Sequence, residues 1–201
     1  MLKIHKGYSL IAMMISLACG MTLMAGLASM VAGLRLSQQL MLDELMLEQE
    51  LSRMVSLIRN ELRTSGQTGG VASTLLSEGS LNSAFSSALS LSAYSGESSQ
   101  SCIEFARDDN DNGTPDSSPV NENKGFRLRE KALEIRVAGH SCLQGGWQDV
   151  SDTGFVSLEN LEFTMTSSLQ QTWVYVSLKV SLAKNPQVHR QSHFIVRLQH
   201  G

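Results

Sequence analysis

The sequence predicts an α+β fold in which a long N-terminal helix packs on an antiparallel β-sheet. Two observations predict the helix. Residues 8–34 contain no charged side chain, and apolar residues then recur at three- and four-residue steps up to residue 64. A third observation predicts the sheet, because several segments after residue 102 alternate apolar and polar side chains. A helix and strands that are each apolar on one face bury those faces against one another, which gives two layers.

The first element, residues 8–34, is long enough to cross a membrane. A helix of this length rises roughly 40 Å, whereas a bilayer core needs only about 20 apolar residues. Lys3 and Lys6 precede the helix, so the positive-inside rule places the N-terminus in the cytoplasm and the rest of the chain across the membrane. The stretch is too long for a secretory signal peptide, and no small-residue cleavage site closes it. Topology alone predicts a signal-anchored, single-pass protein.

The residues around Gly7 carry a family resemblance. The run Lys6-Gly7-Tyr8-Ser9-Leu10-Ile11 resembles the leader junction of type IV prepilins and type II secretion pseudopilins. This resemblance implies that residues 1–7 are a leader and that prepilin peptidase cuts after Gly7 on the cytoplasmic face. It also implies that the peptidase methylates the new N-terminal amine of Tyr8, which stands where the family usually has Phe.

The chain departs from this family at Ala12, because pilins usually carry a glutamate four residues after the first mature residue. A carboxylate inside a membrane is costly and needs a partner. In pilins that partner is thought to be the N-terminal amine of a neighbouring subunit. The absence of this glutamate suggests a subunit that lacks the usual neighbour below it, such as one at or near a filament tip. A subunit that simply tolerates Ala12 is the alternative.

Residues 35–64 predict an amphipathic stem that continues the same helix. No Pro or Gly interrupts it, and Ser65-Gly66 ends it. Its apolar stripe has to be buried, and we expect it to form the core of the following domain rather than a seam with a partner helix. The predicted stripe consists of Leu36, Leu40, Leu47, Leu51, Met54, Val55, Ile58 and Leu62.

Residues 65–101 are rich in serine and predict a connecting region. Scattered leucines and Phe85 interrupt the serines, which favours a region that lies over the stem and contains a short helix. A disordered linker is the alternative.

Residues 102–201 predict the β-sheet domain. Glu130-Lys131 separates two alternating segments and indicates a hairpin turn. Short polar connections between successive segments favour antiparallel pairing. The predicted strands are residues 102–106, 126–129, 132–137, 155–165, 173–182 and 193–198.

A second resemblance lies within this domain and narrows the family. The motifs Cys102-Ile-Glu-Phe, Gly125-Phe-Arg-Leu-Arg and Ser141-Cys142 occur in this order, with the acidic loop Asp108–Asp116 after the first and Trp147 after the last. This set resembles the minor pilin group called prepilin-peptidase-dependent protein B, also described as J-type pseudopilins.

This resemblance implies a pilin-like fold and a non-enzymatic subunit that helps initiate or cap a type IV pilus. The implied partners are other minor pilins, the major pilin and prepilin peptidase. The implied location is the bacterial inner membrane, with the C-terminal domain in the periplasm, and afterwards the pilus or pseudopilus. A J-type minor pseudopilin of a type II secretion system is the alternative within the family.

Two of the three cysteines predict a disulfide. Cys102 and Cys142 lie in the domain that topology places outside the cytoplasm, where thiols oxidise. Their disulfide would close a loop of about 40 residues and stabilise the domain by roughly 3–4 kcal/mol in the chain-entropy model. A reactive or metal-binding thiol is the alternative. Cys19 lies in the membrane stretch and is expected to be an inert, buried thiol.

The loop Asp108–Asp116 fits the first positions of a calcium-binding loop, D-x-[DN]-x-[DN]-G. Pro119 stands at the twelfth position, where such loops usually have a bidentate Glu. Glu122 and Glu104 are the candidate replacements, and a hairpin turn built from residues that favour turns is the alternative. The predicted calcium ligands are Asp108, Asn110, Asn112, Thr114 through its carbonyl, and Asp116.

The remaining motifs argue against an enzyme and against a nucleic-acid-binding protein. The chain has 16 basic and 19 acidic residues, and no basic stripe marks a nucleic-acid surface. No G-x-S-x-G, P-loop or G-x-G-x-x-G motif is present, and no base is specified beside any of the serines. The alternative from another class is a single-pass envelope protein with a calcium-dependent binding domain.

Overall fold

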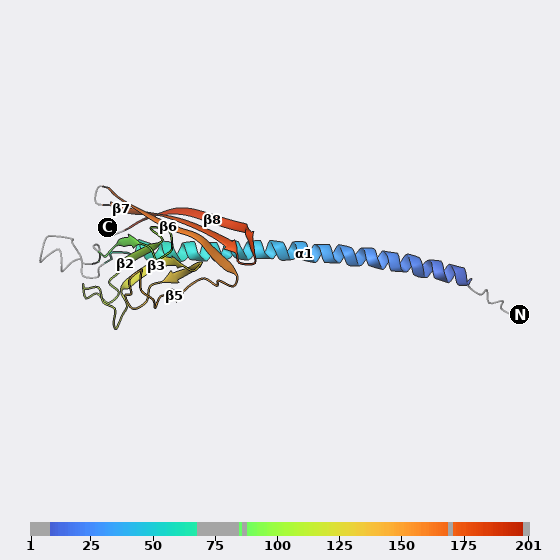
Figure 1. The fold of residues 1–201 in the computed structure, drawn as a ribbon, viewed down its shortest axis with the longest axis horizontal. Helices are drawn as coiled ribbons and strands as arrows, with labels where there is room; N and C mark the ends of the chain where they lie inside the picture. The colour runs from blue at the N-terminus through green and yellow to red at the C-terminus, as the bar shows by residue number, and fades with distance from the viewer. Residues whose placement is uncertain (1–8, 68–84, 86–87, 169–170, 199–201) are drawn as a thin grey trace. The chain divides into compact units, whose positions relative to one another are not determined.

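A computed structural model describes residues 9–67, 85, 88–168 and 171–198 (Figure 1). The chain divides into two units, Met1–Leu45 and Met46–Gly201, and each is described by itself. The predicted α+β class is confirmed, since one long helix precedes two antiparallel sheets.

Helix α1 spans Leu10–Arg63 and contributes residues to both units. Ser9 stands before its first residue, and its carbonyl accepts the N–H groups of Ala12 at 2.9 Å and Met13 at 3.2 Å. The helix ends one residue before the predicted position. Gly66 follows with a positive φ of 74°, and its N–H donates to the carbonyl of Ala106 at 2.9 Å, which turns the chain toward the first sheet.

The first sheet is a five-stranded meander in which each strand pairs with the next. Glu130 and Lys131 form the predicted turn between its third and fourth strands, and both have positive φ. Strands β1 and β5 were not predicted because they are three and two residues long. The strands are β1 (Ser90–Ser92), β2 (Cys102–Ala106), β3 (Asn123–Arg129), β4 (Ala132–Ile135) and β5 (Gln148–Asp149).

The second sheet contains β6 (Val156–Ser168), β7 (Gln171–Leu182) and β8 (Asn185–Arg197), paired in that order. The prediction of a single sheet is therefore wrong, because alternation along a strand does not say which strand will pair with it. The last strand also begins eight residues earlier than predicted. Pro186 obscured its start in the sequence, but proline is tolerated there because β8 lies at the edge of its sheet.

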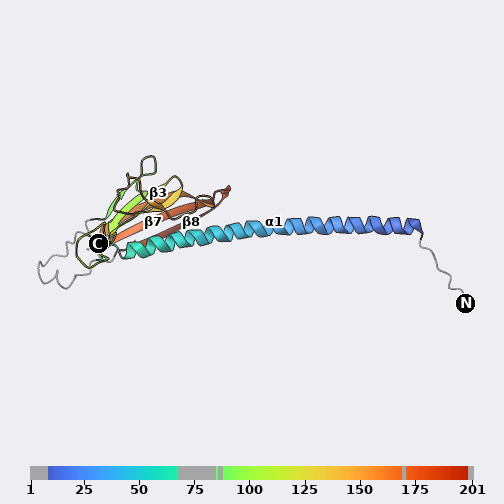
Figure 2. The same cartoon turned by 90° about the horizontal axis from the view of Figure 1, so that it is seen from below.

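The core of the unit Met46–Gly201 lies between α1 and the inner faces of both sheets. Figure 2 shows β7 and β8 alongside the C-terminal part of the helix. Alternate residues of β7 face this core from Val174 to Leu182, as predicted. Each fully buried aliphatic side chain contributes about 1.5–3 kcal/mol relative to its exposed state. The helix residues in this core are Leu47, Leu51, Met54, Val55, Ile58 and Leu62.

Two expectations about the stem and the connecting region need correction. Leu40, predicted to belong to the buried stripe, is 50% exposed. Residues 88–101 of the connecting region form β1 and turns rather than a helix. Residues 68–84 and 86–87 lie outside the described part of the chain, and so does any helix within them.

Candidate functional site

The N-terminal part of α1 carries an uncovered apolar surface. Every residue from Leu10 to Leu34 is exposed in the unit Met1–Leu45, and none is charged. By length and composition the helix is able to cross a membrane, which is consistent with the predicted single-pass anchor. Small residues allow a second helix to approach closely. A Cβ added at Gly20 or Gly26 would meet nothing within 4 Å beyond the adjacent residues and the local helix backbone.

The predicted processing residues, Gly7 and Tyr8, lie outside the described part of the chain, so cleavage between them stays a prediction. Ala12 lies in the first turn of α1, and its side chain provides no carboxylate there. Cys19 is a free cysteine and is exposed. Its expected burial refers to the membrane and to helix packing, so that expectation stays a prediction.

Cys102 and Cys142 form the predicted disulfide, with their Cα atoms 6.2 Å apart. Both are buried, and together with Trp147 they form a small apolar cluster separate from the main core. The N–H of Cys142 donates to Oε1 of Glu104 at 3.0 Å, and Arg136 pairs with the same oxygen at 3.4 Å. Glu104 therefore supports the disulfide rather than the acidic loop.

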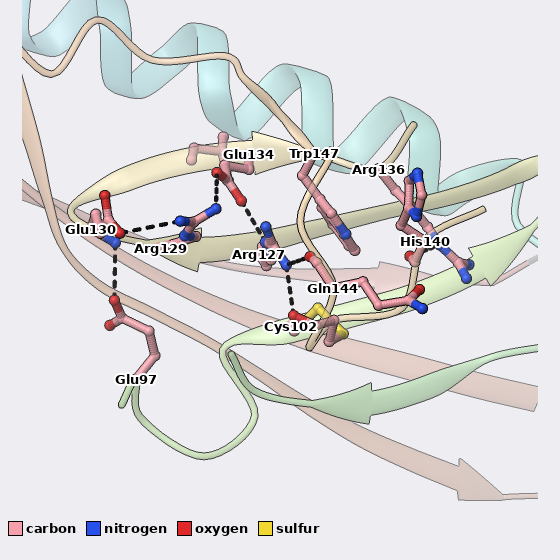
Figure 3. Close-up of polar contacts among 12 residues, drawn as sticks. Glu97, Cys102, Arg127, Arg129, Glu130, Glu134, Arg136, His140, Gln144 and Trp147 are labelled. Atoms are coloured by element: carbon pink, nitrogen blue, oxygen red, sulfur yellow. Dashed lines mark hydrogen bonds and ion pairs between the residues drawn. A yellow bond between two sulfur atoms is a disulfide. The ribbon is translucent and has the colours of Figure 1, made fainter. Parts of the chain in front are cut away.

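Beside the disulfide lies Arg127, a buried cation that the sequence analysis did not identify (Figure 3). Its exposed fraction is 0%, and its guanidinium lies between two rings, 4.8 Å from Tyr94 and 4.5 Å from Trp147. Nη1 donates to the carbonyls of Cys142 at 2.6 Å and Gln144 at 2.7 Å. Arg127 thus holds the disulfide-bearing loop against strand β3.

Glu134 compensates the charge of Arg127. The two residues face each other across β3 and β4 and form an ion pair through Nε of the arginine. Arg129 also reaches Glu134, at 3.8 Å, as Figure 3 shows. Alternation places Arg127 on the opposite face of the strand from Phe126 and Leu128, so the sequence suggested an exposed position. The loop that follows β4 covers this face of the strand, so Arg127 lies in a buried polar region on the side opposite the apolar core.

The structure brings the predicted calcium ligands into one loop. Asp108 is buried, and its two carboxylate oxygens accept the N–H groups of Asn112 and Gly113, each at 3.1 Å. Oδ1 of Asn110 accepts the same Asn112 N–H at 3.0 Å, and Oδ1 of Asn112 accepts the N–H of Thr114 at 2.8 Å. Gly113, with a φ of 78°, allows the tight turn.

Glu122 closes this loop from the other side and is fully buried. Its Oε1 accepts the N–H groups of Asp109 at 2.9 Å and Asn110 at 3.1 Å, and its Oε2 accepts that of Asp116 at 3.0 Å. Of the two candidate replacements for a twelfth-position carboxylate, the structure therefore places Glu122, and not Glu104, at the loop.

The loop fits calcium in the type of its donors, because calcium prefers carboxylate, amide and carbonyl oxygens. Many of these oxygens also accept backbone N–H groups, which maintain the shape of the loop. Within the described ranges, no three His, Cys, Asp or Glu side chains form a group that would hold a metal by themselves. Calcium binding by Asp108, Asn110, Asn112, Thr114 and Asp116 therefore stays a prediction.

Asp109 links the loop to its surroundings. Nε of Arg107 donates to its Oδ1 at 2.5 Å, and Nζ of Lys124 lies 3.0 Å from its Oδ2. Desolvation by burial, the largest single effect, raises the pKa of this carboxyl. The hydrogen bonds and charges of Arg107 and Lys124 together outweigh that effect, so the pKa of Asp109 lies below its ordinary value.

The comparisons with known proteins show the family to which this chain belongs. The family model described as prepilin peptidase-dependent protein B matches residues 40–198. The chain belongs to the prepilin peptidase-dependent protein B family. A protein of this name from Escherichia coli (strain K12) is 26% identical over 164 residues, which cover 79% of this chain and 76% of the relative. No solved structure matches the chain.

The residues that match the prepilin peptidase-dependent protein B family, 40–198, span the disulfide, Arg127 and the acidic loop of this chain. It leaves out residues 1–39, which contain the junction at Gly7. The junction and the family match are therefore independent observations on different parts of the chain.

Proposed function

We propose that this chain is a minor pilin, a structural and non-enzymatic subunit that helps initiate or cap assembly of a type IV pilus. The observation that carries the proposal is the uncovered apolar surface from Leu10 to Leu34, directly after a prepilin-like junction. Membership of the prepilin peptidase-dependent protein B family supports it.

The apolar surface has two successive partners in this proposal. Before assembly it lies in the bacterial inner membrane, and the unit Met46–Gly201 lies in the periplasm, where the disulfide between Cys102 and Cys142 forms. Prepilin peptidase then removes residues 1–7. In the filament the same surface packs against helices of the major pilin and of other minor pilins, so it is buried in both environments.

Ala12 suggests a position at or near the filament tip. A subunit without the usual glutamate has no need of a neighbour below it to neutralise a buried carboxylate. We therefore expect Ala12→Glu to change the amount of this subunit in purified pili or its position along them. Unchanged stoichiometry and position, measured by quantitative mass spectrometry and immunogold labelling, would remove this argument for a tip position.

The proposal is tested by the intact mass and the N-terminus of the membrane-purified chain, from cells with and without prepilin peptidase. We expect a chain that begins at methylated Tyr8 only when the peptidase is present. A Gly7→Val variant should keep residues 1–7 in both strains, and a Gly20→Val variant, changed within the helix, should still be cleaved. A wild-type chain that keeps residues 1–7 in both strains would refute processing and favour the signal-anchored envelope protein.

Processing by itself does not separate a pilus from a type II secretion system. Deleting the gene should abolish or reduce surface pili if the chain acts in a pilus. If deletion leaves pili unchanged and blocks export of secreted enzymes, the chain is a J-type minor pseudopilin instead.

A further inference from the structure

The unit Met46–Gly201 has a cleft lined by three arginines. The cleft has a volume of about 580 Å³ and lies where the last turns of α1 meet strands β7 and β8. Arg59, Arg63 and Arg197 line it, and each is exposed. Trp173 and Ile195 supply an apolar wall, and Ile195 is 54% exposed.

These arginines differ from most other cations of the domain because they have no acidic partner among the residues that the structure describes. Eight lysines and arginines in the described ranges lie within 4 Å of a carboxylate, whereas Arg59, Arg63 and Arg197 form no ion pair with any described residue. Three like charges that share one cleft repel one another. The repulsion is relieved when an anionic group enters.

Aromatic rings support two of these guanidinium groups. Cζ of Arg59 lies 4.9 Å from the centre of the Phe194 ring, and Cζ of Arg197 lies 5.9 Å from that of Trp173. A guanidinium that rests on a ring by its flat side keeps its in-plane N–H groups available. Those N–H groups match the two oxygens of a carboxylate in a bidentate pair.

The cleft also follows an open sheet edge. Strand β8 pairs with β7 on one side only, and residues from both of its faces line the cleft, Val196 from the buried face and Ile195 from the exposed one. An edge strand offers backbone N–H and C=O groups to a second extended chain. An isolated phosphate would use neither this edge nor the apolar wall.

From this juxtaposition we propose that the cleft binds an extended, acidic segment of a different subunit of the filament. In this complex, carboxylates of the segment pair with Arg59, Arg63 and Arg197, and its apolar side chains contact Trp173 and Ile195. The assignment to a filament subunit rests on the proposed function. A lipid surface is a poorer occupant, because Arg59 lies about 20 Å along the helix axis from Met46, where the membrane-side segment joins this unit.

The test uses the full-length chain in detergent and a fluorescein-labelled decapeptide of alternating aspartate and valine, measured by fluorescence anisotropy. A peptide with asparagine in place of aspartate is the control ligand. We expect the aspartate peptide to bind and to dissociate as salt rises, and the asparagine peptide to bind about tenfold more weakly or worse, as expected for the loss of charge-assisted hydrogen bonds.

Three protein variants locate the binding. Arg63→Gln removes an arginine that contacts no described residue through a hydrogen bond or ion pair, so it tests the cleft with little disturbance of the fold. Arg59→Gln/Arg63→Gln should weaken binding of the aspartate peptide by about tenfold or more. Lys179→Gln/Lys184→Gln removes the same charge away from the cleft and should change binding less than twofold.

Four outcomes would overturn the proposal. One is equal weakening by the arginine and lysine variants, and another is equal binding of the two peptides. The third is self-association of the chain that the arginine variants abolish, which would make a second copy the occupant. Preference for a DNA duplex at equal salt would likewise assign the cleft to nucleic acid. Peptide binding does not require leader cleavage, so a chain that retains residues 1–7 and binds the peptide would refute the proposed function alone.

Discussion

Removing the buried charge of Arg127 should unfold the globular unit at a markedly lower temperature. Arg127→Met keeps roughly the aliphatic part of the side chain but leaves Glu134, whose side chain is 7% exposed, with only the longer 3.8 Å contact to Arg129. It also leaves the carbonyls of Cys142 and Gln144 without their donor. Breaking a buried ion pair from one side costs about 3–5 kcal/mol. For a domain of this size, we therefore expect the melting temperature to fall by about 6–20 °C.

Thermal unfolding in detergent, followed by tryptophan fluorescence, measures this effect. Trp147 and Trp173 both lie in the unit Met46–Gly201, so the signal does not report on the apolar N-terminal segment. The control is Lys131→Met, which removes an exposed partner of Glu159 at 3.9 Å and should cost less than about 1 kcal/mol. A double variant, Arg127→Met with Glu134→Leu, should recover part of the loss because no buried carboxylate remains unpaired.

The reasoning would be refuted if Arg127→Met and Lys131→Met lowered the melting temperature equally. It would also be refuted if the double variant were less stable than Arg127→Met alone. The first result would mean that water reaches the guanidinium of Arg127, and the second that Arg129 is enough to hold the charge of Glu134.

Three further predictions concern the disulfide, the acid sensitivity and the loop. Reduction, or Cys102→Ser, should lower the free energy of unfolding by roughly 3–4 kcal/mol, whereas Cys19→Ser should leave urea unfolding of the globular unit unchanged. The lowered pKa of Asp109 stabilises the fold above the pKa of an unfolded carboxyl, about 3.9. That contribution is lost as the pH falls through the folded pKa, so acid titration of Asp109→Asn should show a shallower loss below about pH 4. Millimolar calcium should raise the free energy of unfolding by about 1.4–2.7 kcal/mol at ten to one hundred times the Kd. Magnesium should not, and Asp108→Asn should abolish the increment; equal effects of both ions, or an increment that survives Asp108→Asn, would contradict a calcium site at this loop.

Local patterns were enough to predict most of the elements. The apolar stripe from Leu47 to Leu62 identified the buried face of the helix because residues three and four apart lie on one side of a helix. The alternation from Val174 to Leu182 identified the buried face of β7 because successive side chains of a strand point to opposite sides. The sequence could not predict β1 or β5, since segments of two or three residues are too short to show the alternation of apolar and polar residues that marks a strand.

The candidate sites were predictable only in part, for a physical reason. The cysteine pair was predictable because cysteines that lie outside the cytoplasm are expected to form disulfides. The acidic loop was predictable because the spacing of its Asp, Asn and Gly residues matches a known motif. Arg127 and the cleft arginines carried no such signal. Arginine in an alternating strand and arginine on a helix surface are both ordinary exposed residues until a distant segment covers or faces them.

The sequence by itself determined the class of fold, the apolar N-terminal helix, the disulfide and the order of most of the strands, because each depends on residue types or on spacings of a few residues. Only the tertiary structure decided that the strands form two sheets and that Arg127 is buried. It also decided that Arg59 and Arg63 meet Arg197, more than 130 residues away in the chain. Contacts at that separation depend on how the helix and the sheets pack, and the packing reflects the whole core rather than any one segment.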